Sequence, residues 1–523
     1  MRTLSINIRR ACSRLVLPWL MIWVALGTLA GAQEKPPFIE PSEHVHAKAR
    51  VLEETQPNQH GKWETLDTEM PINPVHVALM HTGKVLVIAG SGNDDKNKRF
   101  DAGVWDPQSQ TIRTFVLGWD MFCNGMVILP DGRPFVLGGT LKYDSPWIGE
   151  PRTAAFDPAT EKFIDLAKMS GGRWYPTGTV LGDGSVMVDS GLDVGSLNHT
   201  VQIYKGTTWS AAGSSFPGMP LYPRQTLLPN GKVFESGANP DSRIYDPAKR
   251  QWSDPVATTK FGNSRDYGTT VLLPLTPAND YKPRVMILGG GFNLGDPVNQ
   301  VVTNTTEIID LSAATPQWQF GPVMSGPRVQ LNATILPDGK VLVSGGSAKD
   351  ENGGTANRQA ELYQPNTNNF SPAGTMEFPR LYHSNTLLLP DATVLAVGGN
   401  PARGDYEAHI EIYSPPYLFD NNGNPARRPA ISQAPAAIQY GASFAVRSAE
   451  AADIDSVVLI RPGAVTHAFD MEQRLVGLSY TKAAGVLNVK APSGGNIAPP
   501  GYYLLFIVNS AGVPSIAKFV YLK

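Results

Sequence analysis

A repeat of about fifty residues organises most of this 523-residue chain and limits the folds that it can adopt. Each copy has an Asp-Gly turn, or a close substitute, followed by a short apolar stretch that ends in glycine. Asp-Gly and Asn-Gly pairs between apolar stretches favour tight hairpins, so each copy predicts antiparallel strands. The turns of the seven copies begin at Thr82, Asp131, Asp183, Asn230, Tyr281, Asp338 and Asp391.

Several copies also contain an aromatic-Asp-Pro turn, as in Phe156-Asp157-Pro158, which separates two further strands. A four-stranded unit with a double glycine and a later aromatic residue is typical of a kelch-type propeller blade. The 51 Gly and 44 Pro fit a chain with many turns, and a hydrophobic content of 42% excludes global disorder. We therefore predict an all-β chain in which residues 61–420 form a seven-bladed kelch-type β-propeller.

The repeats end before a polar linker near Asp420. Residues 428–523 contain short strands, such as Ser456–Ile460, and no helical periodicity. A segment of this length and pattern predicts a C-terminal immunoglobulin-like β-sandwich. Residues 33–60 contain too little apolar sequence for a domain, and we expect an N-terminal extension there.

The first 32 residues have the pattern of a secretory signal peptide. Several arginines precede an uncharged apolar stretch that ends in Ala30-Gly31-Ala32. This arrangement predicts cleavage after residue 32 and a secreted or periplasmic protein. A retained membrane anchor is the alternative, because the apolar stretch approaches the length of a spanning helix.

The net charge of −2 narrows the possible partners. It predicts no attraction to nucleic acid or, once the leader is cleaved, to an anionic membrane surface. A closed propeller needs no second chain, so a monomer is expected. Asn198, Asn304 and Asn332 each begin an Asn-x-Ser/Thr sequence, and the sequence leaves open whether they carry glycans.

Only one cysteine remains after leader cleavage. The two cysteines are Cys12, in the leader, and Cys123, so the mature protein has no internal disulfide. A lone cysteine is most often a small buried hydrophobic residue. The repeat indicates more, because Cys123, Tyr175 and His383 each lie eight residues before the turn aspartate of their copies. We expect them to line one end of the propeller axis.

The residue types at this end of the axis suit a copper ion. Tyr382 is next to His383, and Tyr222 and Tyr267 occupy comparable positions in their copies. Neutral imidazole and phenolate favour Cu(II), and the usual ligand spacing of a zinc site is absent. Each tyrosine alone would more often be a packing residue with a satisfied hydroxyl.

Five motifs occur in order at separate places in the chain: Met121–Cys123, Arg173–Pro176, Arg380–Ser384, Thr466–His467 and Pro500–Ser515. Together they resemble the galactose oxidase and glyoxal oxidase family of radical-copper oxidases. The likeness extends from about residue 60 to the C-terminus. The Arg-Trp-Tyr-Pro run at 173–176 is closer to the glyoxal oxidase branch.

The resemblance implies one copper ion with four ligands: Tyr175, Tyr382, His383 and His467. It also implies a thioether cross-link between Cys123 and the ring of Tyr175, which would hold a radical as a second one-electron centre. His467 would come from a loop of the sandwich, and Tyr382 would act as general base. The implied reaction oxidises small aldehydes or primary alcohols with dioxygen and releases hydrogen peroxide.

One position departs from galactose oxidase. That enzyme has a Trp over the cross-linked pair, eighteen residues after the tyrosine, whereas this chain has Asp193 there with no aromatic residue nearby in the sequence. The chain also lacks the separate N-terminal carbohydrate-binding domain of galactose oxidase. Both differences make galactose an unexpected substrate. Asp193, Trp174 and Trp119 are candidates to line the pocket.

Two other functions stay open at this point. One is a non-catalytic kelch propeller that binds glycans or a partner protein, since propellers host many unrelated functions. The other is a copper protein that never forms the cross-link. The conjunction of Cys123, Tyr175, Tyr382, His383 and His467 favours the oxidase.

Overall fold

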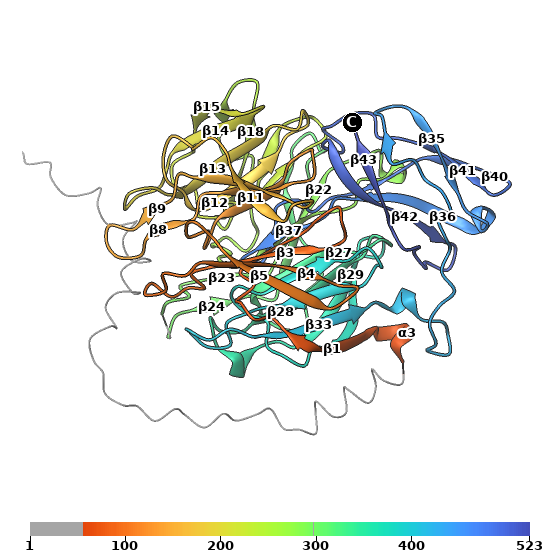
Figure 1. Ribbon diagram of the computed structural model, residues 1–523, viewed down its shortest axis with the longest axis horizontal. Helices are drawn as coiled ribbons and strands as arrows, with labels where there is room; N and C mark the ends of the chain where they lie inside the picture. The colour runs from red at the N-terminus through yellow and green to blue at the C-terminus, as the bar shows by residue number, and fades with distance from the viewer. Residues whose placement is uncertain (1–55, 297) are drawn as a thin grey trace, which may run out of the picture.

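The computed structural model describes residues 56–523 except residue 297, so the predicted leader and most of the predicted N-terminal extension lie outside the described residues. Seven sheets, each built on four antiparallel strands, follow one another along the chain (Figure 1). A smaller pair of sheets follows them. The predicted fold class, an all-β propeller followed by a β-sandwich, is confirmed.

Each blade runs outward from its innermost strand. The first blade consists of β2 His76–Leu79, β3 Val85–Gly90, β4 Asp101–Asp106 and β5 Thr111–Val116, and the second of β6 Gly125–Ile128, β7 Pro134–Leu137, β10 Thr153–Asp157 and β11 Lys162–Asp165. The third blade consists of β12 Trp174–Val180, β13 Val186–Leu192, β14 Thr200–Lys205 and β15 Thr208–Ser214. The fourth consists of β16 Gln225–Leu227, β17 Val233–Glu235, β18 Asp241–Asp246 and β19 Gln251–Trp252, with β20 Ala257–Thr258 beside β18.

The fifth blade consists of β21 Thr269–Leu272, β22 Arg284–Leu288, β25 Thr306–Asp310 and β26 Trp318–Phe320. The sixth consists of β27 Val329–Ile335, β28 Val341–Ser347, β29 Gln359–Gln364 and β30 Asn369–Thr375. The seventh consists of β31 Asn385–Leu388, β32 Val394–Val397, β33 His409–Ser414 and β1 Lys62–Glu69. The short additional elements are α3 Pro57–His60, η1 Pro277–Asn279, η2 Gly353–Thr355, η3 Pro416–Leu418 and η4 Ala451–Asp453, and the hairpins β8 Thr140–Lys142 with β9 Ile148–Gly149 and β23 Gly291–Phe292 with β24 Val301–Val302.

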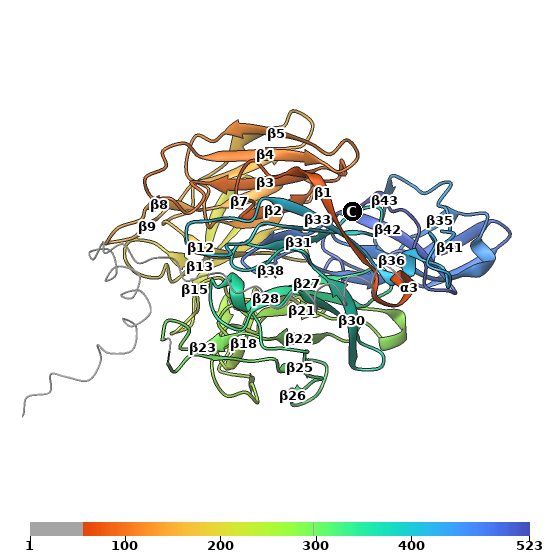
Figure 2. The same cartoon turned by 90° about the horizontal axis from the view of Figure 1, so that it is seen from below.

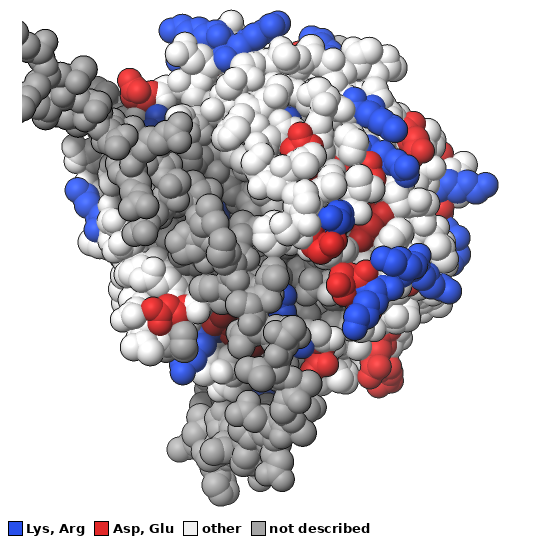
Figure 3. Space-filling model, turned by 90° about the vertical axis from the view of Figure 1, so that its left-hand side faces the viewer, with Lys and Arg blue, Asp and Glu red and all other residues white. Residues whose placement is uncertain are grey.

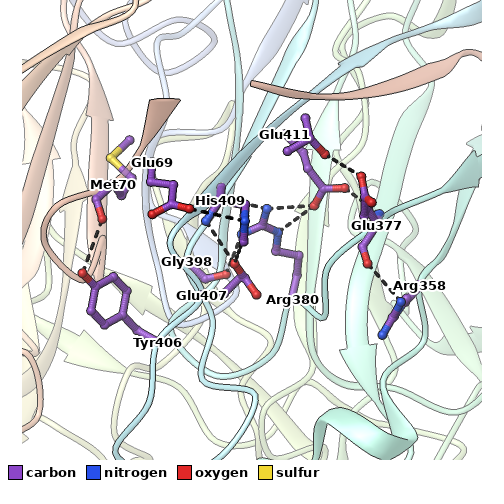
Figure 4. A network of polar contacts seen from close by, with 11 residues as sticks. Glu69, Met70, Arg358, Glu377, Arg380, Gly398, Tyr406, Glu407, His409 and Glu411 are labelled. Carbon is purple, nitrogen blue, oxygen red and sulfur yellow. Dashed lines mark hydrogen bonds and ion pairs between the residues drawn. The ribbon is translucent and has the colours of Figure 1, made fainter. Parts of the chain in front are cut away.

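The N-terminal strand closes the propeller. β1 pairs antiparallel with β33, so the earliest strand of the propeller is the outer strand of its last blade. Figure 4 shows the contacts at this closure, where the His409 imidazole lies between the carboxylates of Glu407 (Nδ1 to Oε1, 2.6 Å) and Glu69 (Nε2 to Oε1, 3.5 Å). This pairing joins the N-terminal strand and the last three strands of the propeller in one sheet.

Buried ion pairs fix the segments that lead into three innermost strands. Arg265 pairs with Glu307 at 2.7 Å, Arg328 with Glu361 at 2.6 Å and Arg380 with Glu411 at 2.8 Å, all within single blades. Arg173, the corresponding residue of the third blade, instead donates to the carbonyl of Ser190 at 2.6 Å and contacts Gln202. Each arginine thus holds the chain just before it reaches the axis.

Glu235, on β17, makes stability depend on pH. The carboxyl group is fully buried, and burial raises its pKa from 4.5 to about 8. Between these values the unfolded chain is ionised while the folded protein keeps the proton, so the free energy of unfolding falls as pH rises. We expect Glu235→Gln to remove about 4 kcal/mol of that fall between pH 5 and pH 8. Urea unfolding of both proteins at the two pH values measures it, and parallel declines would contradict it.

The C-terminal sandwich has two sheets and sends one hairpin into the propeller. Its strands are β34 Ala437–Ile438, β43 Lys518–Leu522, β42 Gly501–Asn509, β36 Ile454–Ile460 and β39 Leu475–Gly477 in one sheet, and β35 Ser443–Arg447, β41 Val486–Lys490 and β40 Tyr480–Ala483 in the other. The hairpin of β37 Ala464–Thr466 and β38 Phe469–Asp470 pairs with β2 of the first blade. Figures 1 and 2 show it among the propeller strands, apart from the rest of the sandwich.

The described surface has both signs of charge and no long apolar helix. Figure 3 shows basic and acidic side chains interspersed over one face. Among the described residues, no helix has the length and apolar character needed to cross a membrane. Two of the three asparagines named above as glycosylation candidates are inaccessible in the folded protein, because Asn198 and Asn332 are buried and donate to Gly172 and Ser384. We therefore expect no glycan on either residue of the folded chain.

Candidate metal centre

Six residues with a left-handed backbone form a ring at one end of the axis, and we call them the axial ring. They are Cys123 (φ 54°), Tyr175 (φ 67°), Tyr222 (φ 46°), Tyr267 (φ 53°), Gln330 (φ 63°) and His383 (φ 66°). Each lies in the first two residues of the innermost strand of its blade or up to three residues before that strand. Such a backbone costs a residue other than glycine about 1–3 kcal/mol, and its recurrence in six blades marks a shared constraint.

Backbone hydrogen bonds join neighbouring members of the axial ring. The amide of Tyr175 donates to the carbonyl of Cys123 at 2.9 Å, and the amide of Tyr222 donates to the carbonyl of Tyr175 at 2.9 Å. On the other side, the amide of Gln330 donates to the carbonyl of Tyr267 at 2.6 Å. The left-handed backbone is therefore tied to blade-to-blade contacts, which fix the side chains relative to one another.

His467 reaches the axial ring from the tip of the β37–β38 hairpin. The two residues of its turn, His467 (φ 49°) and Ala468 (φ 66°), both have positive φ, as a type I′ turn requires. The imidazole lies 4.6 Å from that of His383, 5.1 Å from the ring of Tyr382 and 5.4 Å from the ring of Tyr175, measured between centroids. One hairpin thus places the His467 imidazole beside residues of two blades.

The hydrogen bonds of Thr466 set the tautomer of His467. The Thr466 hydroxyl donates to the carbonyl of Val75 at 3.0 Å, so it can only accept from Nδ1 of His467, 2.6 Å away. Nδ1 therefore carries the proton and Nε2 has a free lone pair. The Cys123 thiol lies 3.4 Å from this Nε2 and can donate to it.

His383 has the same tautomer as His467 for a similar reason. Its Nδ1 lies 2.7 Å from Oδ1 of Asn400, whose amide nitrogen donates to the carbonyl of Asp405. Nδ1 of His383 thus carries the proton, while its buried Nε2 has no hydrogen-bond partner among the described residues. An unpartnered buried nitrogen is costly unless another group, such as a metal ion, binds it.

The two candidate tyrosine ligands lie beside these imidazoles. The hydroxyls of Tyr175 and Tyr382 are 3.2 Å apart. Burial raises the pKa of both phenols well above 10, whereas burial lowers the pKa of His383 to about 3 and that of His467 well below its usual value. The imidazoles are therefore neutral and ready to coordinate, and each phenol needs a cation nearby to lose its proton.

The donors fit a copper ion. The ligand atoms of Cys123, His383 and His467 lie within 4.8 Å of one another, and the rings of Tyr175 and Tyr382 lie beside the two imidazoles. Imidazole nitrogen and phenol oxygen are donors that suit Cu(II). Cys123 is a free, fully buried thiol in contact with this group.

Trp174 covers Tyr175, although the sequence shows no aromatic residue near Asp193. The Trp174 ring stacks on the Tyr175 ring with centroids 5.5 Å apart and planes 12° apart. Asp193 accepts a hydrogen bond from the amide of Gly172 at 2.8 Å and so holds the segment before Trp174. Trp119, the third pocket candidate, packs in another apolar cluster with Met126.

Three residues near the centre were missed by the sequence reasoning. Gln330 was detectable, because it lies eight residues before Asp338 and so has the same place in its repeat. His76 and Asn400 gave no such signal. His76 is fully buried 6.0 Å from the His467 ring, and its two ring nitrogens have no hydrogen-bond partner in the described part of the chain.

Family comparisons agree with this arrangement. Residues 91–417 match the description Glyoxal oxidase N-terminus, and residues 428–522 match Galactose oxidase-like, Early set domain. The first match covers more than half of the chain. The chain therefore belongs to the glyoxal oxidase and galactose oxidase family, and it is a copper-radical oxidase by class.

Similar proteins match most of this chain. An aldehyde oxidase GLOX of Vitis pseudoreticulata is 28% identical over 522 residues, which cover 88% of this chain and 97% of that protein. A galactose oxidase of Gibberella zeae is 26% identical over 507 residues, 88% of this chain and 70% of that protein. A solved structure described as a novel fungal alcohol oxidase of the AA5 family, in complex with copper, has a TM-score of 0.77 at 26% identity and covers 88% of this chain and 99% of its own.

Proposed function

We propose that this protein is an exported oxidase that converts small aldehydes or primary alcohols with dioxygen and releases hydrogen peroxide. The observation that carries the proposal is the pair of neutral imidazoles, His383 and His467, whose Nε2 atoms are unprotonated and whose rings lie beside those of Tyr175 and Tyr382. The relatives named aldehyde oxidase, galactose oxidase and alcohol oxidase support the substrate class.

In this proposal four side chains hold one copper ion: Tyr175, Tyr382, His383 and His467. Bound there, copper supplies a one-electron acceptor and a position for the substrate oxygen. Asn400 and Thr466 orient the two imidazoles through Nδ1, as outer partners of metal-binding histidines do. The hairpin turn positions His467, and the left-handed backbone of the axial ring positions Tyr175 and His383.

Oxidation of an alcohol or of an aldehyde hydrate removes two electrons and two protons. The protein must therefore supply a second one-electron centre, and Tyr175 with Cys123 fills that role. With a cation bound at the site Tyr382 would be a phenolate, and this phenolate would accept the substrate hydroxyl proton. Burial raises the pKa of Tyr382, which makes its phenolate a stronger base. Dioxygen takes the two electrons and two protons and leaves as hydrogen peroxide, which balances the reaction.

The proposed cross-link joins the Cys123 sulfur to a ring carbon of Tyr175. The S–H and one ring C–H bond break, a C–S bond forms, and the two electrons and two protons pass to dioxygen. A sulfur substituent makes a phenol easier to oxidise, so the linked ring holds a radical more readily than a plain tyrosine. Trp174 shields the face of this ring from water.

The mass of the protein tests this proposal. After copper loading in air, we expect a loss of two hydrogens and a peptide pair, containing Cys123 and Tyr175, that stays joined under reducing conditions. Protein kept free of copper is the control and should yield separate peptides. Separate, unmodified peptides after copper treatment would refute the proposed cofactor.

A further inference from the structure

A line of touching aromatic rings leads outward from Tyr175. Trp174 stacks on Tyr175 at 5.5 Å, and the ring of Tyr143 meets that of Trp174 edge to face, with centroids 5.3 Å apart and planes at 74°. Tyr143 follows β8 and is half-buried, and the turn residues after it, 144–146, are exposed. Figure 1 shows the β8–β9 hairpin at the edge of the molecule.

The outer phenol has a built-in proton acceptor. Its hydroxyl donates to Oδ2 of Asp120 at 3.1 Å and contacts the hydroxyl of Ser91. Oδ1 of the same carboxylate accepts from the amides of Ser91 at 2.9 Å and Phe122 at 3.0 Å. Asp120 is buried, and burial raises its pKa, which makes the carboxylate a better base towards the phenol.

We propose that Trp174 and Tyr143 form an electron-transfer route between Tyr175 and one-electron oxidants outside the protein, with Asp120 as the proton acceptor of Tyr143. The route rests on the proposed function, because its inner end is the Tyr175–Cys123 pair. Neither Trp174 nor Tyr143 is among the proposed metal ligands, so the proposed catalytic cycle leaves the contact between them unexplained.

The steps balance for an outer-sphere oxidant such as ferricyanide. Tyr143 gives one electron to ferricyanide, which becomes ferrocyanide, and passes its phenol proton to Asp120. Tyr143 then regains an electron from Trp174 and its proton from Asp120, and Trp174 is refilled by Tyr175. The net change is one electron removed from Tyr175, bound as a phenolate and therefore without a proton to lose, and one ferricyanide reduced. This restores the radical that an inactive, reduced protein lacks.

The route predicts a selective effect of Tyr143→Phe. This variant keeps the ring on Trp174 and removes the hydroxyl that transfers its proton to Asp120. With copper-loaded, reduced protein, we expect oxidation by ferricyanide to be at least tenfold slower, as followed by the absorbance of the Tyr175 radical in stopped flow. Tyr406→Phe is the matched control, because Tyr406 is another phenol with partial exposure, whose hydroxyl donates to Met70. It should oxidise at the wild-type rate.

A solvent isotope effect separates proton-coupled transfer from a packing effect. The wild-type oxidation step should slow in deuterated water, and Tyr143→Phe and Asp120→Asn should both abolish that dependence. The side-chain amide introduced by Asp120→Asn can keep the contacts of Oδ1 but no longer accepts a proton. Wild-type rates and an unchanged isotope effect in Tyr143→Phe would overturn the route.

A metal-free experiment tests the route without the proposed cofactor. Wild-type protein without copper is oxidised photochemically with ruthenium tris-bipyridine and persulfate in the presence of a spin trap, and labelled peptides are mapped by mass. We expect the label on Tyr143 and on Trp174, and its absence from both would overturn the route. If the cross-link test fails while these residues are labelled, the proposed function fails and the outer route stands.

Discussion

Cys123→Ser is expected to bind copper and to lose oxidase activity by at least a thousandfold. The imidazole Nε2 atoms and the phenol oxygens that hold the metal are unchanged by this substitution, so copper affinity should remain within a few-fold of wild type. Without sulfur, no thioether forms on Tyr175, and the plain phenol is harder to oxidise. A thousandfold loss corresponds to about 4 kcal/mol of barrier. Peroxide release in a coupled assay, together with copper stoichiometry, measures both properties.

The variant must also be shown to fold. Cys123 is fully buried, and the introduced hydroxyl can donate to Nε2 of His467 as the thiol does at 3.4 Å. We therefore expect the free energy of unfolding to fall by only about 1–2 kcal/mol, which urea unfolding of the metal-free protein checks. Peroxide production at the wild-type rate by folded Cys123→Ser would contradict the role assigned to the sulfur.

The repeat made the axial ring predictable. Turns such as Asp131-Gly132 fix where each innermost strand ends, so a constant count back from the turn finds equivalent residues of successive blades. The count reached Cys123, Tyr175 and His383, which the structure brings together, and it would also have reached Gln330. The count could not show which members of the axial ring bind a ligand, because Tyr222 also lies eight residues before the turn residue of its copy, Asn230. The residue types and the family resemblance supplied that choice.

The position of His467 was beyond any such count. It lies 344 residues after Cys123, and its hairpin has only three residues in β37 and two in β38. A pattern this short is compatible with a hairpin inside the sandwich and equally with a hairpin that enters the propeller. Its place depends on pairing with β2, a contact of high sequence separation that local periodicity does not encode.

The stacking of Trp174 on Tyr175 was hidden for a different reason. Adjacent residues of a regular strand point to opposite faces, so a neighbour would not be expected to cover the ring of Tyr175. The left-handed backbone of Tyr175, φ 67°, breaks that alternation. The same departure lets Trp174 stack on the Tyr175 ring, although the two residues are neighbours in the chain.

His467→Ala should weaken copper binding by at least a hundredfold. It removes one of two neutral nitrogen donors, and the nearby Cys123 thiol is held protonated because burial raises its pKa. A ligand that binds the folded state stabilises it by about 4.1 kcal/mol at a thousand times its Kd, and by about 1.4 kcal/mol at ten times its Kd. At a copper concentration that stabilises the wild-type protein by about 4.1 kcal/mol, copper should stabilise His467→Ala by only about 1.4 kcal/mol.

His81→Ala is the matched control for this measurement. His81 stacks on Tyr502 of the sandwich at 4.2 Å and is not a member of the axial ring, so its loss removes an imidazole between the two domains without touching the candidate ligands. Urea unfolding with and without copper, at one copper concentration, gives the stabilisation of all three proteins. We expect wild-type stabilisation in His81→Ala. Equal copper stabilisation in His467→Ala would mean that the hairpin only joins the sandwich to the propeller, because the metal would then be held by propeller residues alone.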